Sequence, residues 1–124
     1  MPLKVTVEKK PGGYVVIHPD GHIDATTYKT LAEEVERVLK GSPSLLIFNL
    51  EKVNYVSSAG IGVVLAAEKA LKQTNGKALL VNLKPQIKKV FDIVKALPSQ
   101  QVFASVKELD EYLAEIQRKV REGE

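Results

Sequence analysis

The chain has 124 residues, of which 44% are hydrophobic and 27% charged, the composition of one globular domain rather than of a disordered or fibrous protein. It has no cysteine and two histidines, which excludes a disulfide framework and a structural zinc site, and we expect no metal or other cofactor. The net charge of +3 comes from lysines interleaved with glutamates, and no apolar run approaches the ~18 residues that cross a bilayer. We therefore expect a cytoplasmic protein that does not bind nucleic acid directly and does not insert into a membrane.

The first part of the chain predicts a hairpin followed by an amphipathic helix. Polar and apolar residues alternate over 3–8, as in a half-buried strand, and the run 10–13 supplies turn residues. Residues 14–18 are nearly all apolar and predict a second, more deeply buried strand that ends before Pro19. A helical repeat follows and stops at Gly41. Its apolar face consists of Leu31, Val35, Val38 and Leu39.

The rest of the chain alternates buried strands with helices. The continuous apolar run 45–50 predicts the central strand of the sheet, and a helical repeat begins at Ser58. A strand over 78–81 precedes a third helix that starts at Pro85, and residues 101–103 are a candidate short strand. The last helix has a separate apolar stripe. It consists of Val106, Leu109, Leu113, Ile116 and Val120.

This order of elements predicts one α/β domain with a mixed sheet of four to five strands and about four helices. We expect the domain to span residues 2–117. Residues 118–124 are strongly charged, so they are predicted to form a frayed C-terminal tail.

The turn Val56-Ser57-Ser58-Ala59-Gly60-Ile61-Gly62 is the segment in which we expect the function to lie. Open α/β sheets place their sites at the carboxyl ends of strands, where loops meet the first turns of helices. Ser58 stands just before the helical repeat, so its hydroxyl group is predicted to cap the helix. Two glycines in the opening turns indicate close packing or the close approach of a partner.

Several motifs in their chain order resemble the STAS-domain family, the anti-sigma factor antagonists. They are Gly21-x-Ile23-Asp24, the run from Asn49-Leu50-Glu51 to Gly62-Val63-Val64-Leu65, Asn75-Gly76, and Lys84-Pro85-x-Ile87 with Val90-Phe91. The resemblance covers nearly the whole chain. It implies a protein that binds an anti-sigma factor which is also a serine/threonine kinase, that is released when phosphorylated at the start of the second helix, and that a phosphatase resets.

The resemblance also assigns roles to individual residues. It maps the phosphate acceptor to Ser58 and the partner-binding surface to the turn and to one acidic residue. These partner-binding residues are Asp24, Ser57, Ser58, Ala59, Gly60, Ile61 and Gly62. Ser57 stands where the family usually has an aspartate, which makes it a second candidate acceptor. Asp24 has an alternative role as a cap of the helix that follows it.

Two other classes of function are alternatives to this phosphorylation-controlled binding. One is a permanent STAS-like scaffold subunit of a signalling complex or of the cytosolic machinery of a membrane transporter. The other is a hydrolase with a serine on a strand-to-helix turn, but the glycine that should stand two residues before the serine is absent. The only candidate bases, His18 and His22, are better explained as surface or strand-end residues. We therefore expect no catalytic residues and no enzymatic activity.

Overall fold

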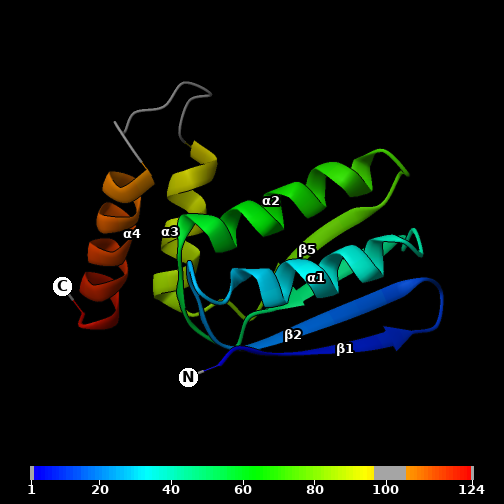
Figure 1. Cartoon of the computed structure of the whole chain (residues 1–124), viewed down its shortest axis with the longest axis horizontal. Helices are drawn as coiled ribbons and strands as arrows, with labels where there is room; N and C mark the ends of the chain where they lie inside the picture. Colours follow the sequence, from blue (N-terminus) through cyan, green and yellow to red (C-terminus); the bar gives the residue numbers. More distant parts are fainter. Residues whose placement is uncertain (1, 97–105, 124) are drawn as a thin grey trace.

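A mixed β-sheet forms the centre of the computed structural model, which describes residues 2–96 and 106–123 (Figure 1). The strands within these ranges are β1 (Lys4–Lys10), β2 (Tyr14–Ile23), β3 (Leu45–Asn49), β4 (Lys52–Val56) and β5 (Lys77–Val81). The helices are α1 (Tyr28–Leu39), α2 (Ser58–Lys72), α3 (Pro85–Ala96) and α4 (Val106–Arg121). The predicted α/β class, mixed sheet and set of helices are confirmed. The candidate strand at 101–103 lies outside the described residues.

Strand β2 organises the sheet because it has a different neighbour on each part of its length. On one side it pairs antiparallel with β1. On the other side, residues 14–17 pair parallel with β3, and residues 20–23 pair parallel with β4. Strand β5 extends the sheet beyond β3. This arrangement brings the end of β2 and the end of β4 together, beside the beginning of α2.

The prediction that the second strand ends before Pro19 is wrong, since β2 continues to Ile23. Proline lacks an amide hydrogen and normally interrupts a strand within a sheet. Here Pro19 falls between the stretch of β2 that pairs with β3 and the stretch that pairs with β4. The change of neighbour makes this one position tolerant of a residue that cannot donate a ladder hydrogen bond.

Strand β4 was not predicted, and it changes which strand leads into α2. The sequence predicts that the central strand at 45–50 leads directly into the turn before α2. In the structure β3 ends at Asn49, and the chain forms β4 before it reaches α2. Val53 and Val56 are buried within β4, while Lys52 and Asn54 are exposed. The alternation over these five residues is too short to predict a strand between the apolar run at 45–50 and the helical repeat that begins at Ser58.

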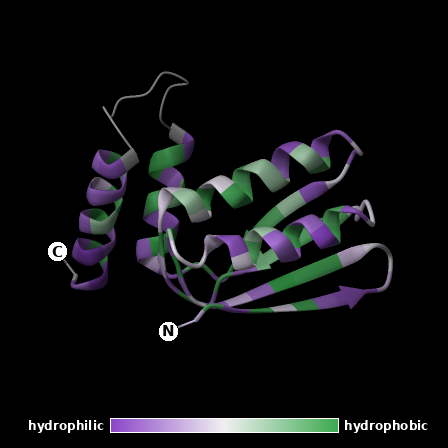
Figure 2. Ribbon diagram, viewed as in Figure 1, coloured by the Kyte–Doolittle hydropathy of each residue, from purple (hydrophilic) through white to green (hydrophobic). Residues whose placement is uncertain are grey.

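The helices cover the sheet in two groups (Figure 1). Helices α1 and α2 lie side by side along one face of the sheet, whereas α3 and α4 pack against each other at one end, where α3 contacts β4. The central part of β2 is hydrophobic and α4 is largely hydrophilic (Figure 2), as expected for a buried strand and an outer helix. The largest fully buried side chains of the core include Ile17, Leu31, Leu46, Phe48, Ile61, Ile87 and Leu113.

The C-terminal segment is more ordered in secondary structure than the sequence predicts. A frayed tail was expected from residue 118 onward, but α4 continues to Arg121. Arg118 forms ion pairs with Glu115 and Glu122 at the spacing of one helical turn, which supports the helix at this end.

Candidate functional site

The junction between β4 and α2 is held by Ser57 rather than by Ser58. Ser57 has an extended backbone, and its hydroxyl oxygen accepts a hydrogen bond from the amide of Gly60 at 3.4 Å. Its own amide donates to the carbonyl of Ile23 at 2.8 Å, and the residue is only 3% exposed. The prediction that Ser58 caps the helix is therefore wrong by one residue. The burial of Ser57 also argues against it as an acceptor that a kinase could reach.

Ser58 is the first residue of α2, and it is partly exposed. Its amide donates a hydrogen bond to Oδ1 of Asp110, in α4, at 2.8 Å. Within the part of the chain that the structure describes, its hydroxyl group makes no hydrogen bond. The hydroxyl group that was predicted to accept phosphate is thus at the surface and not engaged in capping.

The two glycines of the turn face in opposite directions. A Cβ atom on Gly60 would lie 2.6 Å from Cγ2 of Ile23 and 2.8 Å from Cγ2 of Val56, both closer than such atoms can approach. A Cβ atom on Gly62 would have no atom within 4 Å. Gly60 therefore allows α2 to begin close against the sheet, while Gly62 leaves the outer surface of the helix flat.

These positions give opposite effects for the same substitution. Gly60→Ala should lower the free energy of unfolding by about 1–3 kcal/mol, because the added methyl group overlaps buried side chains. Gly62→Ala should raise it by up to about 1 kcal/mol, since alanine favours a helix interior and the space is open. Urea unfolding of the two variants measures both. Equal stability of the two variants would contradict this packing.

Asp24 organises the turn that precedes α1. Its Oδ1 accepts hydrogen bonds from the amide and hydroxyl groups of Thr26 at 2.9 and 2.8 Å, and from those of Thr27 at 3.1 and 3.2 Å. The hydrogen bond from the Thr26 hydroxyl group is the largest of the effects that lower the pKa of Asp24, and burial opposes it. These contacts agree with the structural alternative for Asp24. Its Oδ2 accepts no hydrogen bond from the described residues, so a partner contact stays a prediction.

The lowered pKa of Asp24 predicts a contribution to acid stability. A carboxyl group whose pKa is lower in the folded state stabilises the fold above its unfolded pKa, about 3.9, and loses this effect as the pH falls through the folded pKa. Asp24→Asn should therefore be less stable than the wild type at pH 7, with the difference shrinking below about pH 4. Urea unfolding at several pH values measures this, with the exposed Glu33→Gln as the control. A constant difference across this range would contradict the role of the charge.

Helix α4 holds the junction through Gln117, which sequence reasoning missed. Gln117 is 0% exposed; its Oε1 accepts from the amide of Val56 at 2.9 Å, and its Nε2 donates to the carbonyl of Val56 at 2.8 Å. The side-chain amide pairs with β4 as a neighbouring strand would. The available signal was the spacing of Asp110, Leu113 and Gln117, which share one face of the helix at i, i+3 and i+7.

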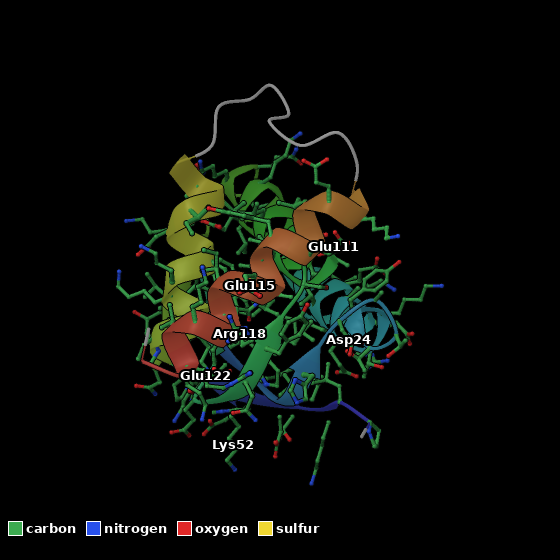
Figure 3. All side chains as sticks on the ribbon, turned by 90° about the vertical axis from the view of Figure 1, so that its left-hand side faces the viewer. Asp24, Lys52, Glu111, Glu115, Arg118 and Glu122 are labelled. Carbon is green, nitrogen blue, oxygen red and sulfur yellow. The ribbon has the colours of Figure 1, made fainter. Side chains whose placement is uncertain are left out.

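Tyr55 is close enough to two carboxylates near the junction for their charges to act on it. Burial raises the pKa of Tyr55, and the negative charges of Asp110 and Asp24 raise it further. Its ring lies 6.0 Å from that of His22. Figure 3 shows Asp24 to one side of β4, and Glu111 and Glu115 along α4, which crosses in front of the strand. The surroundings of Ser58 therefore carry negative charge contributed by two separate elements.

An apolar groove of about 430 Å³ lies between α1 and α2 and begins beside Ser58. Ala59, Gly62 and Val63 line it from α2, and Tyr28 and Leu39 line it from α1. Of the predicted partner-binding residues, Ser58, Ala59 and Gly62 are accessible, whereas Ser57, Gly60 and Ile61 are buried. The outer surface of the turn is thus formed by Ser58, Ala59 and Gly62, and contact of a partner with the buried Gly60 and Ile61 stays a prediction.

The described ranges, 2–96 and 106–123, contain neither a metal-binding cluster nor a membrane-spanning helix. No three His, Cys, Asp or Glu side chains there come together as ligands for a metal ion. None of the helices in these ranges is long and apolar enough to cross a membrane. His18 contacts Glu8 at 3.1 Å and Asn49 at 3.4 Å, on β1 and β3, as a strand residue rather than as a base for the serines.

Comparison with known proteins identifies the family to which the chain belongs. The model of the STAS domain family matches residues 4–109. The chain belongs to the STAS domain family. It is 30% identical over 91 residues to BtrV of Bordetella bronchiseptica, described as an anti-sigma factor antagonist, covering 73% of this chain and 78% of that protein.

Solved structures of the anti-sigma factor antagonist SpoIIAA have the same fold. The unphosphorylated anti-sigma factor antagonist SpoIIAA aligns with a TM-score of 0.63 and 22% identity, over 90% of this chain and 98% of that one. The phosphorylated form of SpoIIAA, the Bacillus cell fate determinant, aligns with a TM-score of 0.63 and 25% identity. The alignment covers 73% of this chain and 83% of that one. The predicted family and fold are confirmed.

Proposed function

We propose that this STAS domain is an anti-sigma factor antagonist, which binds an anti-sigma factor kinase through the start of α2 and is released when Ser58 is phosphorylated. The observation that carries the proposal is the accessible hydroxyl group of Ser58 at the N-terminus of α2, next to an apolar groove. The relative described as an anti-sigma factor antagonist and the solved phosphorylated form of SpoIIAA support it. In the modification, Oγ of Ser58 bonds to the γ-phosphorus of ATP, the bond to ADP breaks, and the hydroxyl proton leaves.

The binding surface consists of the accessible residues of the turn and the groove that continues from them. Ala59 and Gly62 present little bulk, so a partner side chain can pack against the backbone of α2 and enter the groove. Tyr28 adds an aromatic side chain on the α1 side. A surface of this kind suits an apolar patch of the partner placed directly over Ser58.

Phosphate on Ser58 would oppose such a complex through its charge. It adds about −1.5 to −2 charges at a position that the partner covers. The isolated domain tolerates the anion, because the first amides and the dipole of α2 favour negative charge. An apolar or acidic partner would instead have to strip water from the phosphate, and a loss of about 3 kcal/mol already weakens binding over a hundredfold.

The direct test uses the cognate anti-sigma factor and ATP. Incubation should add the mass of one phosphate to the intact protein, and peptide mapping should place it on Ser58. Ser58→Ala should remain unmodified, whereas the matched control Ser57→Ala should still be phosphorylated, since Ser57 is buried. An unchanged intact mass of the wild type would refute this function.

The alternative is a permanent scaffold that uses the same surface. The carboxylates of Asp110 and Asp24 near the junction favour this alternative, because negative charge disfavours the addition of phosphate. A stoichiometric complex that survives treatment with kinase and ATP would select the scaffold over the switch.

A further inference from the structure

Helix α4 makes hydrogen bonds to the junction on both sides of Ser57. Gln117 bonds to the backbone of Val56, and Asp110 bonds to the backbone of Ser58. The two side chains lie about 10.5 Å apart along the helix, at 1.5 Å per residue, with the fully buried Leu113 between them. One face of α4 is therefore hydrogen-bonded to the end of β4 through Gln117 and to the start of α2 through Asp110.

The parts of α4 around these two contacts differ in burial. Leu113 and Gln117 are both 0% exposed and anchor the middle of α4. In the first turns, Lys107, Glu108, Glu111 and Tyr112 are exposed, and Leu109 and Asp110 are only partly buried. Segments with few buried side chains open locally at low free energy. The hydrogen bond of Asp110 thus joins these partly exposed first turns of α4 to the start of α2.

Asp110 occupies the position that a phosphate on Ser58 would use. The amides of the first turn of α2 lack helical partners and attract anions. One of them, the amide of Ser58, already donates a hydrogen bond to the carboxylate of Asp110. The amide and the hydroxyl group belong to the same residue, so a phosphate on Oγ would be built within a few ångströms of this carboxylate. Two anions would then share one helix N-terminus. Burial contributes most to the raised pKa of Tyr55, and the further contribution of Asp110 and Asp24 agrees with negative charge near the junction.

We propose that Asp110 is the positioning residue through which phosphorylation of Ser58 acts on the last helix. In the unmodified protein Asp110 fixes the amide of the acceptor residue and holds the first turns of α4. The phosphate repels the carboxylate and takes over the amides of α2, so the contact breaks and these turns loosen, while Gln117 keeps the rest of α4 in place. The inference rests on the proposed phosphorylation, and it adds a second surface, at the start of α4, that differs between the two states.

Hydrogen exchange of the full chain with phosphoserine incorporated at position 58 tests the inference. Installing the modification directly makes the measurement independent of whether a kinase acts on this site. Compared with the unmodified protein, the amides of residues 110–114 should exchange about tenfold faster or more. Those of β3 should not change, because β3 pairs with residues 14–17 of β2, whereas the junction contacts β2 at Ile23.

Two variants separate repulsion of Asp110 from a general effect of the phosphate. Asp110→Asn keeps an oxygen that can accept the Ser58 amide but has no charge, so phosphoserine should no longer speed exchange in α4. The matched control Glu111→Gln removes the same charge from the next, exposed residue, and there the response should remain.

The outcomes distinguish this inference from the proposed function. Unchanged exchange at 110–114 in the phosphoserine protein would refute the role of Asp110, as would faster exchange throughout the chain or the same response in Asp110→Asn. Equal affinity of both forms for the anti-sigma factor would refute the switch itself, whatever α4 does.

Discussion

Replacement of Ser58 by glutamate should weaken binding to the anti-sigma factor by about a hundredfold, or ~3 kcal/mol. The carboxylate imitates part of the charge of a phosphate, and the partner must desolvate it at the start of α2. The sheet and α2 should keep their fold, because a negative charge at the first residue of a helix is favourable, and any loosening should be confined to the first turns of α4. Titration calorimetry with the purified partner measures the change.

The matched control for charge is Ser58→Gln. Glutamine has nearly the same size as glutamate and no charge, so any effect of bulk alone appears in both variants. We expect glutamine to reduce the affinity much less than glutamate. Equal affinities of the two variants would mean that shape, and not charge, governs the surface around Ser58.

Gln117→Leu should lower the free energy of unfolding by about 2–6 kcal/mol, because the amide and the carbonyl of Val56 each lose a buried partner, at about 1–3 kcal/mol per group. Leucine has a similar volume, so the loss does not come from a cavity. Urea unfolding monitored by circular dichroism measures it.

Gln86→Leu provides the control for this second prediction. Gln86 is also buried, but its side chain makes a single hydrogen bond to β4, to the carbonyl of Asn54 at 3.3 Å. Its replacement should cost clearly less than that of Gln117. Equal costs would contradict the view that Gln117 acts as a substitute for a neighbouring strand.

The fold was predictable from sequence where the signal is local. The helices and strands β3 and β5 follow from apolar periodicity and from turn residues, which depend on neighbours a few positions away. Strand β4 and the second half of β2 depend instead on their pairing with each other. Pro19 and Gly21 in β2 carry the local signature of a turn, and only the change of pairing partner at this point explains why the strand continues.

The same division applies to the candidate site. The motif around Ser58 identified the junction, because a strand, a cap and small residues in succession are a local pattern. It could not assign the cap to Ser57 or show that Gly60 faces inward, since both depend on packing against Ile23. Asp110 contacts Ser58 across 52 positions of the chain, and Gln117 contacts Val56 across 61, so their spacing on one face of α4 could not show which residues they contact.

The affinity of the cognate anti-sigma factor for unmodified and Ser58-phosphorylated protein is the most direct test of the switch. Both forms can be prepared from one sample, separated by charge and verified by intact mass. The account predicts binding of the unmodified form and an affinity at least about a hundredfold lower for the phosphorylated form. Equal affinities of the two forms would contradict it.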